Sequence, residues 1–170
     1  MLNYSKKQSG VTLIELLIAI AILSILLAIA VPNFGSWLQN TQIRTATESI
    51  KNGLQLARAE AIRRNEPVSF ILASTTSTAW TVITVAGTQI QQRLSSDGSP
   101  NVTAVVTPAT GTTVTYNRLG RISNTATAIT KIVLNGPSAQ NRSLTINISS
   151  AGQIRGCDPA ITDTTDPRHC

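Results

Sequence analysis

The sequence predicts an α+β protein in which one long N-terminal helix packs against an antiparallel β-sheet. Two observations support this prediction. Apolar residues recur at three- and four-residue steps as far as Arg64, which indicates a helix. After Pro67 the chain changes to short segments rich in Thr, Val, Ile and Ser that alternate with a period of two, which indicates strands. One helix followed by a run of strands is typical of the α+β class.

The first part of this helix is apolar enough to cross a membrane. Residues 11–31 form an apolar run of 21 residues. Such a run is about 32 Å long as a helix, close to the thickness of a hydrocarbon core. Its polar residues are Thr12, Glu15 and Ser24. We therefore predict a membrane-spanning segment.

Two alternatives to a membrane span are weaker. A core helix of a soluble protein seldom has such a long apolar run, and a secretory signal would have a shorter one with a small-residue cleavage site at its end. Here the run ends at residues 31–34, Val-Pro-Asn-Phe. Lys6 and Lys7 precede the run and the next basic residue is Arg44. The positive-inside bias therefore predicts a cytoplasmic N-terminus and an exported remainder.

Glu15 is a carboxylate inside the apolar run. A charge within a spanning helix costs about 2.5–3.5 kcal/mol on insertion scales, and less near the interface. One interpretation is an interfacial residue that snorkels or takes up a proton. The other is a carboxylate that pairs with a cation in an assembly. Because the run contains no cation, the α-amino group of Val11 in a neighbouring subunit would serve, provided that the chain is cut after Gly10.

The helix is expected to continue beyond the membrane segment. Pro32 and Gly35 predict a kink or a weak stretch. The apolar stripe expected to face the sheet is Ile43, Ala46, Ile50, Leu54, Ala57 and Ala61. Glu60 and Arg64 have the spacing of a solvent-exposed helical ion pair. Residues 65–67, Asn-Glu-Pro, predict the end of the helix.

Seven strands are expected after the helix. Turn-forming residues such as Asp97-Gly98 and Gly136-Pro137 separate them. The expected strands are Val68–Ala73, Ala79–Val85, Thr88–Leu94, Val102–Val106, Thr112–Tyr116, Ile129–Leu134 and Leu144–Ile148.

The chain carries a basic excess, with a formal net charge of +6. Residues 62–156 contain eight basic side chains, seven of them Arg, and two acidic ones. Arginine is well suited to phosphate, so DNA binding is one hypothesis. Its candidate residues are Arg118, Arg121, Arg142 and Arg155. The acids Asp158, Asp163 and Asp166 follow and would repel phosphate. We favour the simpler interpretation, a basic surface that aids solubility or contacts acidic neighbours.

Two cysteines, Cys157 and Cys170, lie in the C-terminal tail. In an exported protein they are expected to form a disulfide. The bridge would close a loop of 14 residues. Closure of a loop of this size contributes about 3 kcal/mol against unfolding. Two free thiols are an alternative, as is a metal site that adds His169 with Asp163 or Asp166.

We predict no enzyme activity and no cofactor. His169, beside the C-terminus, is the only histidine in the sequence, and no Gly-rich phosphate loop is present.

The segment Gly10-Val11-Thr12-Leu13-Ile14-Glu15, preceded by lysines and followed by the apolar run, resembles the leader of type IV pilins and type II secretion pseudopilins. The resemblance implies cleavage between Gly10 and Val11 by a prepilin peptidase, followed by N-methylation of Val11. It also implies that Glu15 helps to register the subunit during filament assembly. Most family members have Phe where this chain has Val11.

Two further segments resemble the FimT/FimU minor pilins and the H-type, GspH-like pseudopilins. These segments are residues 56–68, at the junction of helix and first strand, and residues 143–154; Leu119-Gly120-Arg121 resembles a glycine motif of the same branch. Some FimT relatives are DNA-uptake pilins with a Gly-Arg-x-Arg turn, and here Gln153 replaces its first arginine. A C-terminal disulfide loop is frequent in type IV pilins and unusual in type II pseudopilins, which favours a pilus.

The expected organisation is a removed leader (1–10), a transmembrane and assembly helix (11–34) and a periplasmic pilin-like α+β domain (35–170) with a C-terminal disulfide loop (157–170). We predict a minor type IV pilin, a structural adaptor near the pilus tip. The alternatives are an H-type pseudopilin of type II secretion and a DNA-binding minor pilin. The expected partners are other major and minor pilins, the prepilin peptidase and the bacterial inner membrane; DNA is not favoured. The protein would reside in that membrane and then enter a pilus or pseudopilus.

Overall fold

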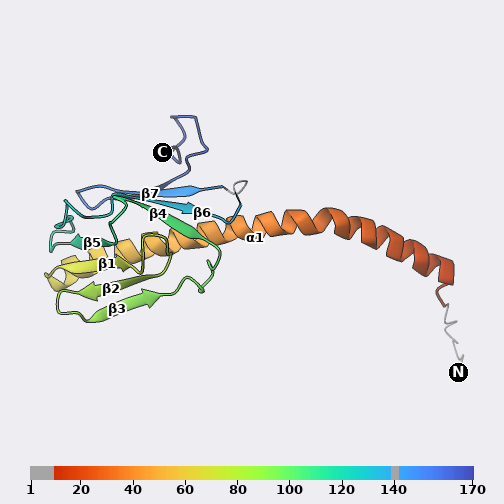
Figure 1. Cartoon of the computed structure of the whole chain (residues 1–170), viewed down its shortest axis with the longest axis horizontal. Coiled ribbons are helices and arrows are strands. Elements are labelled where there is room, and N and C mark those ends of the chain that lie inside the picture. Colours follow the sequence, from red (N-terminus) through yellow and green to blue (C-terminus); the bar gives the residue numbers. More distant parts are fainter. Residues whose placement is uncertain (1–9, 139–141) are drawn as a thin grey trace, which may run out of the picture. The chain divides into compact units, whose positions relative to one another are not determined.

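A computed structural model describes residues 10–138 and 142–170 (Figure 1). Within these residues the chain forms one helix and eight strands. They are α1 (Leu13–Arg64), β1 (Val68–Leu72), β2 (Trp80–Thr84), β3 (Gln89–Arg93), β4 (Thr103–Thr107), β5 (Thr113–Tyr116), β6 (Lys131–Asn135), β7 (Leu144–Ile148) and β8 (Ile154–Cys157). The chain divides into two compact units, with the division between Trp37 and Leu38. Lys6 and Lys7 of the expected leader lie outside the described residues.

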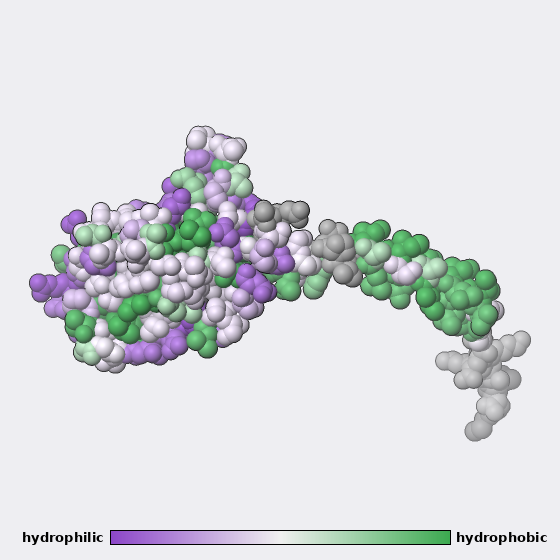
Figure 2. Space-filling view, in the orientation of Figure 1, coloured by the Kyte–Doolittle hydropathy of each residue, from purple (hydrophilic) through white to green (hydrophobic). Residues whose placement is uncertain are grey.

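The first unit contains the N-terminal part of α1. Thr12 caps the helix, because its Oγ1 accepts a hydrogen bond of 3.3 Å from the backbone N–H of Glu15. The large apolar side chains from Leu13 to Ile29 are exposed, and Figure 2 shows an almost continuous hydrophobic surface over this part of the helix. Among the described residues, α1 is the one helix long and apolar enough to cross a membrane. The α1 backbone is continuous past Pro32, where a kink or weak stretch was expected.

The second unit begins with the rest of α1, and here the apolar stripe is buried. Every residue of the expected stripe, from Ile43 to Ala61, is at most 1% exposed. The helix ends where Asn65 adopts a left-handed conformation with a φ of 56° and Pro67 follows. The predicted stripe and helix end are therefore confirmed.

The eight strands form two antiparallel sheets, whereas the sequence predicted one. The orders are β3-β2-β1-β5 and β4-β6-β7-β8. The chain changes sheet between β3 and β4, returns for β5, and changes again for β6. Side chains of α1 and of both sheets meet in one hydrophobic core, whose largest members include Phe70, Tyr116 and Ile132. The predicted α+β class is confirmed, and a helix packed on antiparallel strands remains its organising feature (Figure 1).

A glycine allows α1 to approach β1 and β2 closely. A Cβ atom on Gly53 would lie 2.9 Å from Cε2 of Phe70 and 3.0 Å from the Trp80 ring. The indole N–H of Trp80 donates a 2.9 Å hydrogen bond to Oγ of Ser49, one turn earlier on the same helix. Glycine costs about 1 kcal/mol in a helix interior. Close packing against two aromatic rings offsets this cost.

All seven expected strands are present, each within two residues of its predicted ends. The eighth strand, β8, was not predicted from the sequence. This strand has four residues, contains Gly156 and exposes Arg155, so it lacks the alternating apolar pattern of the others. It pairs with β7 through a turn at Gly152, whose φ is 80°.

Candidate functional site

Gly10 and Val11, the two residues of the expected cleavage site, are exposed and precede α1. Thr12 and Glu15 occupy the first and fourth positions of a capping box. The bond from the Glu15 N–H to Thr12 is present. The reciprocal bond from the Thr12 N–H to the Glu15 carboxylate is not found among the described residues, nor is an ion pair of Glu15. The capping geometry therefore leaves this carboxylate free to meet a partner.

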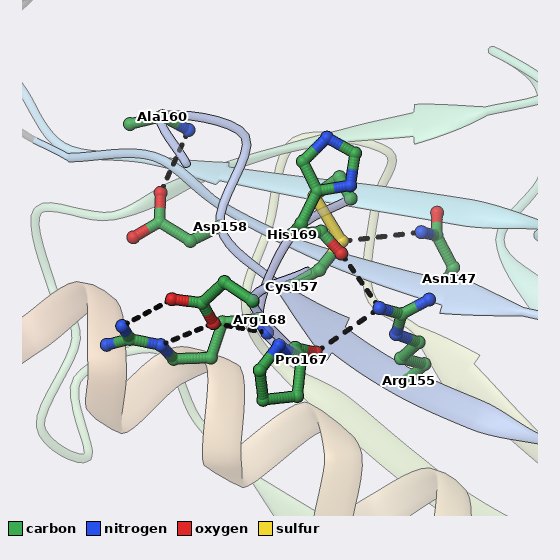
Figure 3. The surroundings of a disulfide bond; sticks show 10 residues. Asn147, Arg155, Cys157, Asp158, Ala160, Pro167, Arg168 and His169 are labelled. Carbon is green, nitrogen blue, oxygen red and sulfur yellow. Dashed lines mark hydrogen bonds and ion pairs between the residues drawn. A yellow bond between two sulfur atoms is a disulfide. The ribbon is translucent and has the colours of Figure 1, made fainter. Parts of the chain in front are cut away.

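The two cysteines are joined, as expected: a disulfide links Cys157 at the end of β8 to Cys170. Arg155 fastens the tail further, because its Nη2 donates to the carbonyl oxygens of Pro167 at 3.2 Å and His169 at 2.9 Å (Figure 3). The N–H of Asp158 donates to the carbonyl of Arg168 at 2.7 Å. The alternatives are not supported, since the described residues contain no free cysteine and no cluster suited to a metal ion.

The acids of the tail are largely engaged by its own neighbours. Asp158 is buried and forms an ion pair with Arg142. Asp166 pairs with Arg168 at 2.8 Å. Hydrogen bonds from the Arg168 side chain and backbone lower the pKa of Asp166 to about 2. The tail is thus an internally neutralised cluster, and the expected repulsion of phosphate by free carboxylates applies mainly to Asp163.

A groove of about 520 Å³ lies between α1 and the β8 side of the second sheet. Its lining includes four cations, Arg44, Lys51, Arg142 and Arg168. Three of the four are already paired: Lys51 with Glu48 at 3.1 Å, and the two others with tail aspartates. Because these charges are compensated, the groove is a poor candidate for strong anion binding.

Arg118 and Arg121 lie in a different setting, on the turn at residues 117–122. Asn117 holds this turn: its Oδ1 accepts from the N–H groups of Leu119 at 2.9 Å and Arg121 at 3.1 Å. Its own N–H donates to the Arg121 carbonyl, and its carbonyl accepts from Gly120, both at 2.8 Å. Both arginines are exposed. Neither takes part in an ion pair found between described residues.

The four candidate DNA-binding arginines lie in different settings in the structure. Arg142 precedes β7, whereas the 117–122 turn contacts the residues that follow β7, where the Ile122 N–H donates to the Ser150 carbonyl at 3.2 Å. The five residues of β7 separate these places by about 17 Å. Arg142 forms an ion pair with Asp158, and Arg155 donates hydrogen bonds to two carbonyl oxygens of the tail. Of the four candidates, Arg118 and Arg121 are the two whose guanidinium groups form no ion pair or hydrogen bond found between described residues.

The 117–122 turn packs against α1. A Cβ atom on Gly120 would lie 2.9 Å from Cδ1 of Ile62 and 3.0 Å from Nε of Arg58. A Cβ atom on Gly152 would lie 2.1 Å from the Gly120 carbonyl oxygen. Both glycines have a positive φ, so no other residue fits well at either position. Below the turn, burial raises the pKa of the Tyr116 hydroxyl, and the charge of Arg58 opposes this shift.

Glu60 pairs with two arginines near the end of α1, whereas the sequence predicted a pair with Arg64 alone. Its carboxylate accepts from Arg63 at 2.6 Å and from Arg64 at 2.7 Å. These hydrogen bonds lower the pKa of Glu60 to about 2. The cluster retains one net positive charge.

Two exposed apolar residues were not predicted from the sequence: Ile62 and Leu119, which are 52% and 74% exposed. Ile62 could have been recognised, because it directly follows stripe residue Ala61 and so points away from the buried face. Leu119 is an apolar residue in a turn between two arginines, which is also unusual.

An exposed apolar helix that continues as a buried stripe on antiparallel strands is the construction of a type IV pilin-like protein. The family model of the type II transport protein GspH matches residues 46–152, and that of the prokaryotic N-terminal methylation motif matches residues 5–31. The chain belongs to the GspH family, within the type IV pilin superfamily. The predicted FimT/FimU and GspH-like branch is confirmed.

Individual relatives agree with this assignment. A fimbrial protein of Pseudomonas aeruginosa is 30% identical over 115 residues, which cover 64% of this chain and 75% of the relative. The type IV major fimbrial protein FimA of Dichelobacter nodosus is 31% identical over 87 residues, 48% of this chain and 53% of FimA. The crystal structure of the minor pilin FimU from Pseudomonas aeruginosa matches with a TM-score of 0.55 and 20% identity, covering 66% of this chain and 86% of FimU. That last likeness shows the shared fold.

Proposed function

We propose that the chain is a minor type IV pilin, a structural adaptor subunit that supports pilus assembly near the tip. The observation that carries this proposal is the exposed apolar part of α1. Leu13, Leu17 and Ile25 are 79%, 55% and 62% exposed. Lipid would cover such a surface before assembly, and the helices of neighbouring pilins would cover it afterwards.

Processing at residues 10 and 11 would prepare the chain for assembly. A prepilin peptidase would cut between Gly10 and Val11, and the new N-terminus of Val11 would be methylated. The accessible position of this bond, before the first turn of α1, supports cleavage there. The resulting amine would pair with Glu15 of a neighbouring subunit, which compensates the cost of a carboxylate in the apolar run.

The proposed location is the bacterial inner membrane, with residues 11–34 spanning it and residues 35–170 in the periplasm. The disulfide between Cys157 and Cys170 suits an oxidising compartment. The chain would then leave the membrane and enter a filament.

A pilus is favoured over a secretion pseudopilus. The C-terminal disulfide loop and the fimbrial names of two relatives support a pilus. The GspH family model keeps a type II secretion pseudopilin as the alternative. Purified filaments from the native cells distinguish the two, because the subunit would be found either in pili or with secretion components.

Replacement of Glu15 tests the assembly mechanism. Glu15→Gln retains a residue suited to the capping box but removes the charge. We expect subunit incorporation into sheared pili to fall at least about tenfold, because an opposite-charge pair in a low-dielectric setting exceeds the 1.4 kcal/mol that corresponds to this factor. The matched control is Thr12→Ala, which removes the capping oxygen and keeps the charge.

Normal incorporation of the Glu15→Gln variant would contradict the pairing mechanism. The mass of the mature chain tests the leader independently. A mass that includes residues 1–10 would contradict cleavage between Gly10 and Val11.

DNA binding is the second candidate function, and the uncommitted Arg118 and Arg121 are the observation that favours it. Residues 35–170 would be titrated with duplex DNA over a salt series. Binding that weakens with salt and with Arg118→Ala/Arg121→Ala would support it. Absence of binding at low salt would remove it.

A further inference from the structure

We propose that the 117–122 turn and Ile62 of α1 form a docking surface for an acidic protein partner. We call this surface the turn surface; it consists of Ile62, Arg118, Leu119 and Arg121. The partner is another subunit of the same assembly, with an apolar recess for Leu119 and carboxylates for the two arginines. This inference rests on the proposed function, since it concerns the neighbours of a filament subunit.

The first support is the rigidity of the turn. Four hydrogen bonds involving Asn117 define the backbone from 117 to 121. Gly120 and Gly152 lock the turn onto α1 and onto the β7–β8 turn. The exposure of Leu119 is therefore imposed by its backbone and is not the result of a loose loop. A preorganised apolar group loses little entropy on binding, which favours its use as an anchor.

The second support is an exposed aliphatic residue of α1 that lies beside the turn. Cδ1 of Ile62 would lie 2.9 Å from a Cβ atom on Gly120, the residue next to Leu119. Each of the two side chains is more than half exposed. Single exposed aliphatic residues are common on proteins, but neighbouring ones on a rigid support are typical of interaction surfaces.

The third support is the uncompensated charge. The sequence contains no acidic residue between Asp97 and Asp158, so the segment around the turn supplies no carboxylate to Arg118 or Arg121. Arg142 and Arg155, by contrast, are engaged by the tail. An acidic partner would meet the turn surface without first breaking an ion pair of these two arginines, which favours encounter as well as affinity.

The uncharged residues of the turn favour a protein partner over nucleic acid. The tip of the turn is a leucine, which offers no hydrogen bond to phosphate or to a base edge. Single-stranded nucleic acids bind on aromatic side chains, and residues 117–122 contain none. A leucine flanked by arginines suits a protein interface with an apolar centre and a charged rim.

Photo-crosslinking in pilus-forming cells tests the proposal. The full-length chain would carry p-benzoylphenylalanine at position 119 or, separately, at position 62. Position 85 is the matched control, because Val85 is 72% exposed and lies on the β2–β3 hairpin. We expect an adduct from positions 119 and 62 but not from 85. Mass spectrometry of the adduct should place the crosslink beside acidic residues of another pilin subunit.

Charge reversal tests whether the two arginines hold the partner. Arg118→Glu/Arg121→Glu should reduce the adduct at least about tenfold, because like charges would then face each other. Reversal of the crosslinked partner's acidic residues to Lys should restore it. If the reversed chain does not accumulate, Arg118→Ala/Arg121→Ala takes its place, and the same loss of adduct is expected.

Other outcomes overturn the proposal. They are equal adducts at positions 85 and 119, no adduct at either 119 or 62, an adduct indifferent to charge, or an adduct that nuclease removes. Subunit incorporation into sheared pili is scored in the same cells. Incorporation without the charge-dependent adduct would refute the docking surface alone. The charge-dependent adduct without incorporation would refute the pilus role alone.

Discussion

The two parts of α1 differ in what covers their apolar side chains. Between Leu13 and Ile29 the large aliphatic residues are at least 52% exposed. Between Ile43 and Ala61 the stripe residues are at most 1% exposed, because they pack on two sheets. One continuous helix thus contributes to a folded domain in its second part and depends on an external environment in its first. Stability and assembly should therefore respond to different substitutions.

Composition accounts for this difference. The first part of α1 is apolar on all sides, which suits lipid or surrounding helices. The second part buries one apolar stripe and includes Gly53, Ala46 and Ala57 at the face that meets the strands. Small residues permit close packing on a sheet, so strands of the same chain cover the apolar side chains of this part.

Leu54→Ala should give the largest loss of domain stability. Leu54 is fully buried in the shared core, and such a truncation typically costs about 2–5 kcal/mol. Denaturant unfolding of residues 35–170 measures the change. The control is Leu94→Ala, a half-exposed site where about 0.5 kcal/mol or less is expected. Equal losses at the two positions would contradict the assignment of Leu54 to the core.

Leu23→Asp should affect the other part of the helix by a similar energy and with a different readout. Leu23 is 55% exposed in the apolar run. Exchange of Leu for Asp at the centre of a spanning helix costs about 3–4 kcal/mol on insertion scales. We expect less protein in the membrane fraction and an unchanged melting temperature of the domain. A melting temperature that falls as it does for Leu54→Ala would contradict the view that Leu23 does not stabilise the folded domain.

Gly53→Ala should destabilise the domain by a smaller amount. The new methyl group would meet Phe70 and Trp80 at about 3 Å. Overpacking typically costs about 1–3 kcal/mol, and the gain in helix propensity returns up to about 1 kcal/mol. Thermal unfolding followed by circular dichroism measures the balance. An increase in stability would mean that α1 can move away from these rings without loss.

Glu60→Gln should have the smallest effect, and that effect should depend on pH. The folded-state pKa of Glu60 is about 2, below its ordinary value of 4.5. The contribution of the Glu60 cluster is therefore fully present above about pH 4.5 and is lost as pH falls through about 2. Exposed pairs of this kind contribute a few tenths of a kcal/mol. Melting temperatures of the two proteins should differ at pH 6 and converge near pH 2; a constant difference would contradict the proposed ionisation.

Features with a local origin were predictable from the sequence. The burial of Ile50 and Leu54 follows from a 3.6-residue period, and the end of α1 follows from Asn65 and Pro67. Strands such as β1 and β2 were found within two residues because apolar and polar residues alternate along them. The disulfide was expected because the chain has only two cysteines and its sequence predicts export.

Features that depend on distant segments were decided by the tertiary structure. Nothing local to β4 and β5 shows that these consecutive strands enter different sheets. The commitment of Arg142 to Asp158, and of Arg155 to the tail carbonyls, depends on a tail that folds back along β8. The sequence by itself determined the helix, its two kinds of surface and most strands, since periodicity acts over a few residues. Only the tertiary structure decided which arginines have partners in the tail and which apolar residues pack together, because those contacts join residues far apart in the chain.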